Sequence, residues 1–201
     1  DRSSAASDVY KRQTPEELTQ MQSLTADCLD AGALGFSTGL YYAPGNYART
    51  DEVVALAKEA AKRSKLYSTH MRDESDYSIS LFGSIEETIA IGRLSEVRVQ
   101  ISHLKCVGPP VWGRSRELLD RIERARAEGI DATYDVYPYT AAGTHLAQSV
   151  PAWLQEGGEN AMLKRLRNPV ERKRATEDIR QGHFGGLPWK FDTFVISYVK
   201  T

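Results

Sequence analysis

Two histidines, His70 and His103, each end a run of residues with strand character, 66–70 and 97–103. Parallel α/β barrels bring the carboxyl ends of their strands together at the active-site mouth. A neutral imidazole nitrogen is a good ligand for divalent zinc. One histidine in such a place fits a core or capping role, but two at equivalent positions predict a shared metal site. Two ligands are still fewer than the three that a catalytic zinc usually takes from protein.

Further polar residues follow the predicted strands at the same end: Arg72, Asp73, Glu74, Lys105, Asp135, Tyr137 and Tyr139. A buried cation needs a partner, so a lysine at the mouth of the site suits a substrate that carries a carboxylate. The alternative interpretation is a solvated loop or helix cap for residues 72–74 and a surface-loop lysine for Lys105.

The apolar pattern predicts alternating helices and strands from Thr14 onward. Thr14, followed by Pro15 and Glu17, is typical of a helix start with a capping box. The inner side of this helix is expected to carry residues at helical spacing, namely Leu18, Met21, Leu24 and Cys28. Later helices are predicted to begin at Thr50 and to include 85–94 and 118–125. Strands are predicted at 33–38, 66–70, 97–103 and 130–137.

The predicted strands end near positions 38, 70, 103 and 137, at intervals of 32, 33 and 34 residues. Short buried strands alternating with helices form parallel βαβ units. A near-constant unit length favours an α/β fold of the (β/α)8 TIM-type barrel over a doubly wound sheet, which periodicity alone leaves open. Four units make about half of such a barrel, so a partial barrel is expected over residues 14–148.

The two ends of the chain depart from this rhythm. Residues 1–13 have no apolar periodicity and are expected to be a non-native leader, with a natural disordered leader as the alternative. Residues 149–193 contain prolines and paired glycines around a charged helical stretch, 159–180, and predict a lid-like insertion. Residues 194–201 are expected to begin a returning barrel strand.

Composition excludes several classes of protein. The net charge is -1, without a basic stripe, which argues against a nucleic-acid partner. No apolar run reaches the roughly 18 residues that a membrane span needs. Cys28 and Cys106 lack CxxC spacing, so we interpret both as ordinary thiols rather than a zinc-ribbon or redox pair. The start carries no signal-peptide pattern, which favours the cytoplasm, although the true N-terminus is expected to lie upstream.

Four blocks of sequence resemble the signature blocks of the N-acyl-D-amino-acid deacylase (D-aminoacylase) family of the amidohydrolase superfamily. They are residues 32–40 (GALGFSTGL), 69–74 (THMRDE), 101–105 (ISHLK) and 137–141 (YPYTA). The blocks follow the family's order and spacing, and the similarity runs from about Thr14 to the C-terminus. The resemblance implies the superfamily's barrel and zinc-dependent hydrolysis of the amide bond of a small molecule, an N-acyl-D-amino acid, to a carboxylate and a free D-amino acid.

The resemblance also implies roles for single residues. His70 and His103 match the family's zinc-binding histidines on consecutive strands. Lys105 matches a lysine that contacts the substrate carboxylate. Tyr42 and Tyr137 match tyrosines that line the substrate pocket.

Some family features are altered or lie elsewhere. Gly143 stands where relatives tend to have a serine that touches the substrate carboxylate, so Thr144 replaces that contact or the contact is lost. The family's His-x-His pair, metal-binding cysteine and general-base aspartate are not in this chain, and the aspartate is expected beyond Thr201. This chain alone is therefore expected to be inactive. His145 and His183 match no ligand block and are expected to face solvent.

Two other functions stay open at this point. One is a hydantoinase-like or dihydroorotase-like amidohydrolase. Such enzymes commonly carry a carboxylated lysine on a strand ahead of the two histidines, whereas the strand ahead of His70 offers only Phe36, Ser37 and Thr38. The other is a non-catalytic α/β binding domain in which both histidines belong to the core.

Overall fold

The computed structural model describes residues 13–181 and Val195. The leader expected over 1–13 and the strand expected over 194–201 therefore lie outside the described residues, apart from Gln13 and Val195. A four-stranded parallel sheet forms the centre, with its strands side by side in sequence order. The strands are β1 (Gly35–Gly39), β2 (Leu66–His70), β3 (Arg98–Ile101) and β4 (Ala132–Tyr134).

Four helices alternate with these strands: α1 (Pro15–Asp30), α2 (Thr50–Ala61), α3 (Ser80–Ser95) and α4 (Ser115–Ala127). The predicted capping box opens α1. The Thr14 hydroxyl accepts from the Glu17 N–H at 3.2 Å, and the Glu17 carboxylate accepts from the Thr14 N–H at 2.7 Å. Short 3-10 turns at Gly45–Tyr47 (η1), Pro109–Val111 (η2) and Leu146–Ser149 (η3) interrupt the connecting loops.

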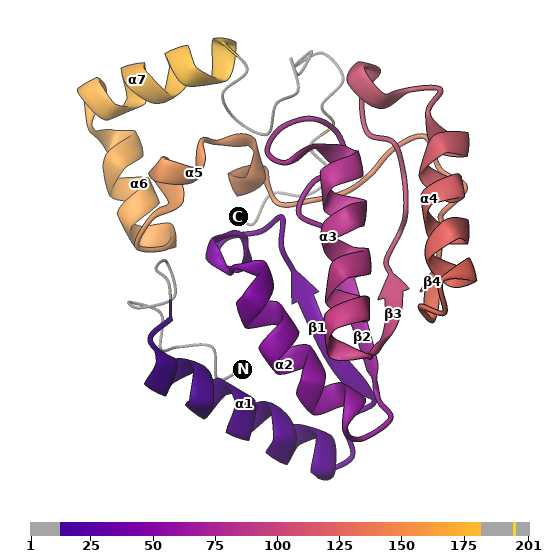
Figure 1. Ribbon diagram of the computed structural model, residues 1–201. Helices are drawn as coiled ribbons and strands as arrows, with labels where there is room; N and C mark the ends of the chain where they lie inside the picture. Colours follow the sequence, from indigo (N-terminus) through magenta and orange to yellow (C-terminus); the bar gives the residue numbers. More distant parts are fainter. Residues whose placement is uncertain (1–12, 182–194, 196–201) are drawn as a thin grey trace.

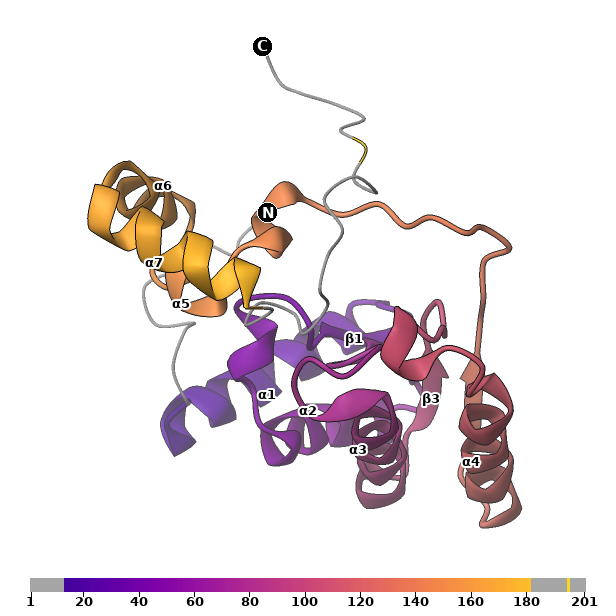
Figure 2. The same ribbon diagram turned by 90° about the horizontal axis from the view of Figure 1, so that it is seen from above.

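The arrangement of helices on the sheet identifies the architecture. Figures 1 and 2 show α2, α3 and α4 on one side of the sheet, while the segment that leaves β4 runs along the other side. A doubly wound sheet would reverse its strand order and carry helices on both faces. Sequential order with one helical layer is the pattern of a barrel wall, so the predicted α/β fold with about four barrel units is confirmed.

The two faces of the sheet differ in chemistry. Tyr67, Val99 and Ile101 are fully buried against the helices, in one core with Ile85 and Leu118.

The opposite face carries a row of polar side chains in register, namely Ser37, Ser68, Gln100 and Thr133. Successive residues of a strand point to opposite faces, which accounts for the separation. In a barrel wall this polar face would look into the barrel.

The prediction of which α1 residues face the core is wrong in part. Cys28 is exposed and Leu24 is 64% exposed, whereas Leu29 is buried. The helix lies at the end of the row and packs mainly on α2 and β1, so only part of its apolar stripe is covered. Helical spacing finds an apolar stripe but does not show which part of it has a neighbour.

Beyond β4 the chain forms a second group of helices, α5 (Ala152–Gln155), α6 (Glu159–Arg167) and α7 (Pro169–Arg180). They share a small core of Leu154, Met162 and Ala175, separate from the main one. The expected charged stretch, 159–180, is two helices because Asn168 caps α7 directly ahead of Pro169. The interpretation of residues 149–193 as a lid stays a prediction.

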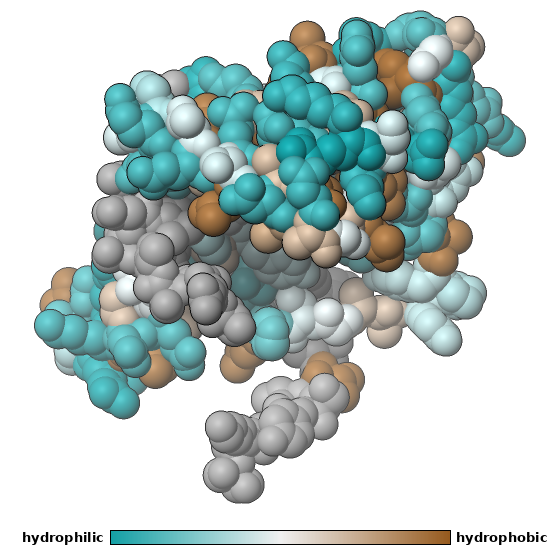
Figure 3. Space-filling view, turned by 90° about the horizontal axis from the view of Figure 1, so that it is seen from below, coloured by the Kyte–Doolittle hydropathy of each residue, from teal (hydrophilic) through white to brown (hydrophobic). Residues whose placement is uncertain are grey.

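The outer surface is polar over most of the face seen in Figure 3, with hydrophobic residues scattered among hydrophilic ones. Within the described residues, none of the helices combines the length and the apolar character that crossing a membrane requires.

Candidate metal centre

His70 and His103 meet at the carboxyl end of the sheet. His70 is the last residue of β2, and His103 lies two residues after β3. Their ring centroids are 4.6 Å apart, with the ring planes at 76°. Glu74 joins them, and one ligand atom from each of the three residues lies within 4.8 Å of the others. The predicted convergence of the two histidines is thus present, with a carboxylate that the sequence did not single out as a ligand.

His103 has an unusual backbone conformation. Strand β3 ends at Ile101, earlier than the predicted end at 103, and His103 has a φ of 42°. That left-handed conformation is costly for a residue other than glycine and persists only where its surroundings hold it. Asp135 does so: its carboxylate accepts from the His103 N–H at 2.8 Å and from Gln100 Nε2 at 2.7 Å. The end of β4 therefore fixes the loop that presents His103.

The nitrogens of the two rings have different partners. Nδ1 of His70 is 2.9 Å from the Met71 carbonyl oxygen. A carbonyl only accepts, so Nδ1 carries the proton and Nε2 keeps a free lone pair for a metal. Nδ1 of His103 is 3.1 Å from Glu74 Oε1 and 2.8 Å from Lys105 Nζ. One of these neighbours accepts and the other donates, so they favour opposite tautomers.

Burial and charge set the protonation states around the site. Burial lowers the pKa of His70, against a smaller opposing effect of Glu74, which keeps the imidazole neutral at pH 7. For Glu74, burial alone would raise the pKa, but the hydrogen bond with His103 and the charge of Lys105 outweigh it and lower the pKa. A neutral imidazole beside an ionised carboxylate is a donor set that suits a divalent cation.

Tyrosines form one wall of the site. Tyr41 stacks on His70 with centroids 5.5 Å apart, and Tyr42 meets the same ring edge-on at 4.8 Å. Tyr77 packs edge-on against Tyr41. Burial raises the pKa of Tyr41 to about 12, so its phenol stays protonated. Tyr42 was expected here from the family resemblance, whereas Tyr41 and Tyr77 were not.

The expected substrate-binding residues lie next to the histidines. Lys105 Nζ is 5.5 Å from the centre of the Tyr137 ring, which stacks in turn on Tyr139. The structure therefore brings together His70, His103, Lys105, Tyr42 and Tyr137. The substituted position Gly143 and its neighbour Thr144 lie in the exposed segment after β4, and a Cβ added at Gly143 would meet nothing within 4 Å.

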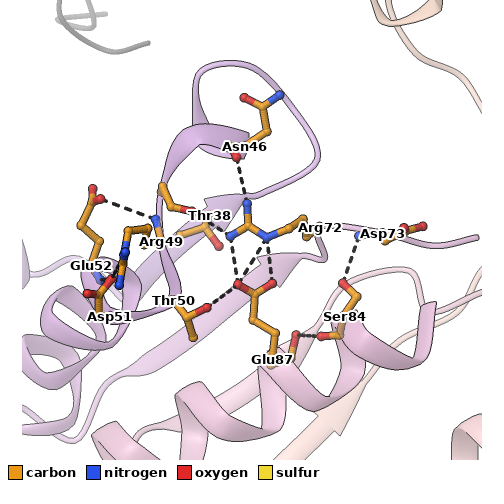
Figure 4. Close-up of polar contacts among 12 residues, drawn as sticks. Thr38, Asn46, Arg49, Thr50, Asp51, Glu52, Arg72, Asp73, Ser84 and Glu87 are labelled. Atoms are coloured by element: carbon orange, nitrogen blue, oxygen red, sulfur yellow. Dashed lines mark hydrogen bonds and ion pairs between the residues drawn. The ribbon is translucent and has the colours of Figure 1, made fainter. Parts of the chain in front are cut away.

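Arg72 and Asp73 do not form the solvated loop that was the alternative interpretation. Arg72 donates to the Glu87 carboxylate at 2.9 Å and to the carbonyl oxygens of Asn46 and Ala48 at 2.9 and 2.8 Å (Figure 4). Thr50 Oγ1 donates to the same Glu87 carboxylate.

The fully buried Asp73 carboxylate accepts backbone N–H bonds from residues 75, 77, 78 and 80. Both side chains thus build the loops that frame the site, and neither is left over to bind a ligand.

Known proteins were compared with the chain. No family model matches it. It is 40% identical over 145 residues to an N-acyl-D-glutamate deacylase of Alcaligenes xylosoxydans xylosoxydans, which covers 72% of this chain and 29% of that protein. A D-aminoacylase of the same organism is 40% identical over 147 residues, 73% of this chain and 30% of that protein. The chain belongs to the N-acyl-D-amino-acid deacylase family. It spans under a third of the length of these relatives.

Solved structures agree with this assignment. The N-acyl-D-glutamate deacylase of Bordetella bronchiseptica, complexed with zinc and a phosphonate mimic of the tetrahedral intermediate, matches with a TM-score of 0.63 and 42% identity over 66% of this chain and 27% of that one. A D-aminoacylase variant in complex with copper chloride matches with a TM-score of 0.66 and 40% identity over 70% of this chain and 29% of that one. Relatives thus take up divalent metals, and the His70, Glu74 and His103 donors fit one.

Proposed function

We propose that this chain forms part of a zinc-dependent deacylase that hydrolyses N-acyl-D-amino acids to a carboxylate and a free D-amino acid. The observation that carries the proposal is the meeting of His70, Glu74 and His103 directly beside the ammonium group of Lys105. Two imidazoles that can bind a metal, next to a fixed cation, suit a substrate with an amide bond close to a carboxylate. The curated relatives are named for that class of substrate.

Zinc is the metal we infer, because imidazole is a ligand that it prefers and two histidines meet at this site. Zinc bound here would polarise the amide carbonyl and acidify a water molecule. The chain's own residues bind and orient the substrate. Lys105 holds its α-carboxylate by a charge-assisted hydrogen bond, while Tyr42 and Tyr137 line the pocket and exclude water. The general base is expected to be an aspartate elsewhere in the protein.

The test is to purify the intact protein, measure its metal content, and follow release of free amino acid from N-acetyl-D- and N-acetyl-L-amino acids. We expect about one zinc or a substitute divalent metal per chain, activity lost with a chelator and restored with zinc, and a preference for the D-enantiomers. Zinc binding without release of amino acid from any N-acyl substrate would contradict the proposal. Absence of bound metal would favour the non-catalytic binding domain.

A further inference from the structure

Glu74 occupies a fixed position between a metal-ligand histidine and the lysine expected to bind substrate. Its side chain is 8% exposed, and Oε1 lies 3.1 Å from His103 Nδ1 and 2.5 Å from Lys105 Nζ. The backbone of Glu74 is held on both sides: its N–H donates to the Tyr77 hydroxyl, and its carbonyl oxygen accepts from the Val107 N–H. A carboxylate with so little access to water stays ionised only if charged and hydrogen-bonding groups surround it.

Lys105 and Glu74 have opposite effects on His103. An ammonium group only donates, so Lys105 bound to Nδ1 would require the lone pair there and place the proton on Nε2. An imidazole in that state has no Nε2 lone pair to offer a metal. A carboxylate only accepts, so Glu74 bound to Nδ1–H leaves the lone pair on Nε2. The Lys105 ammonium lies closer to Glu74 Oε1 than to the ring nitrogen, 2.5 against 2.8 Å.

We propose that Glu74 is a positioning residue that holds His103 in the tautomer able to bind the metal by engaging both the ring N–H and the ammonium of Lys105. The inference rests on the proposed function, because it assumes that His103 is a ligand and that Lys105 is needed nearby for the substrate carboxylate. A site that requires a lysine beside a ligand histidine also requires an anion between them. Carboxylates that orient ligand histidines in this way commonly affect metal affinity by about 10- to 100-fold.

Direct ligation by Glu74 is the competing role, since its carboxylate is within reach of both rings. Oε1 already has two partners, His103 and Lys105. The two roles of Glu74 predict different effects on metal affinity when Lys105 is replaced. If Glu74 positions, removing Lys105 from a Glu74 variant restores metal affinity, because the group that favours the wrong tautomer is gone. If Glu74 is a ligand, removing Lys105 restores nothing.

The experiment is a double-mutant cycle on the intact protein, with zinc affinity measured by competition with a chromophoric chelator. The variants are Glu74→Gln, Lys105→Met and both together. We expect Glu74→Gln to weaken zinc binding by about 10- to 100-fold, Lys105→Met to leave it within about threefold, and the double variant to return to within about threefold of Lys105→Met. Unchanged affinity in Glu74→Gln, or a double variant as weak as Glu74→Gln, would overturn the inference.

A matched control is Glu59→Gln, which removes another nearly buried carboxylate paired with two cations, Lys62 and Arg63, far along α2. Its zinc affinity should equal that of the wild type. Thermal melts of all variants show whether each is folded. Glutamine keeps the size of the side chain, and cobalt in place of zinc gives a second readout, because the visible spectrum of Glu74→Gln keeps its shape unless a ligand is lost. A wild-type protein that binds no metal would defeat the proposed function itself, a result distinct from every outcome above.

Discussion

His70 and His103, the two predicted metal ligands, are held in place by different means. His70 is the last residue of β2, and its ring packs against both Tyr41 and Tyr42. His103 stands outside its strand and depends on Asp135 and Glu74 for its backbone and its ring. The first site residue thus relies on burial, and the second on polar contacts from two neighbouring segments.

The pKa of His70 predicts a pH dependence of stability for the metal-free protein. Burial lowers that pKa below its ordinary value of 6.5, so the folded state binds fewer protons than the unfolded state as the pH falls through 6.5. The free energy of unfolding should therefore decrease between pH 7.5 and pH 5.5. Urea unfolding in the presence of a chelator measures it, and His70→Gln should flatten the dependence in this window. An equal decrease in the variant would show that other groups cause it.

Lys105 is predicted to act on substrate binding more than on turnover. Replacing it by methionine removes a charge-assisted hydrogen bond of about 1.5–3 kcal/mol, which corresponds to roughly a 10- to 100-fold rise in KM for an N-acetyl-D-amino acid. Steady-state kinetics measure KM and kcat separately. Lys58→Met, on α2, serves as the control and should leave both constants unchanged. If Lys105→Met keeps the wild-type KM, the lysine does not hold the carboxylate.

At the scale of elements, the end of β4 shapes the end of β3. The Asp135 carboxylate accepts a hydrogen bond from the His103 N–H. The Asp135 N–H donates to the Ile101 carbonyl oxygen, and the Asp135 carbonyl oxygen accepts from the Leu104 N–H. Asp135→Ala should weaken zinc binding by about tenfold, because the left-handed backbone at His103 loses its support. Asp135→Asn, which keeps an acceptor oxygen, should weaken it less. Chelator competition measures both, with the exposed Asp131→Ala as control. If Asp135→Ala binds zinc as tightly as the wild type, the backbone conformation of His103 does not depend on this carboxylate.

The sequence predicted some elements better than others for physical reasons. Strand β2 and the start of α1 match the prediction because hydrophobic pattern and capping residues act locally. The end of β3 does not, since nothing in the pattern announces a left-handed histidine.

The role of Glu74 depends on His103, 29 residues away, so no local signal could reveal it. Lys105 and Tyr137 were expected near the site because they follow predicted strands, whereas Tyr42 was expected only because of the resemblance to a known family.

At the scale of the whole molecule, the sheet behaves as part of a barrel wall. Its inner face carries Ser37, Ser68, Gln100 and Thr133 in register, where barrels more often have bulky apolar layers. Gln100 accepts from Thr133 and donates to Asp135, so this layer leads directly to the support of His103. The polar side chains on this face therefore support the residues of the site through hydrogen bonds.

The chain by itself is predicted to lack deacylase activity. Among the described residues β1 and β4 each pair with one strand only, so each leaves an unpaired edge that favours association. The general base that the family resemblance implies is expected outside this chain, and loss of such a group typically lowers rates by about 10²- to 10⁴-fold. Expressing residues 14–201, adding zinc and assaying N-acetyl-D-amino acids measures this. Turnover equal to that of the intact protein would contradict it.

X-ray absorption at the zinc edge of the intact protein reports directly on the ligands of the metal. If His70 and His103 bind zinc, the spectrum will show nitrogen scatterers at about 2.0–2.1 Å with the outer-shell signal of imidazole rings. Replacing His103 by alanine should remove the signal of one ring or abolish binding, whereas replacing the exposed His145 should change nothing. A spectrum in which the His103 variant keeps the full imidazole signal at undiminished zinc content would contradict the metal centre described here.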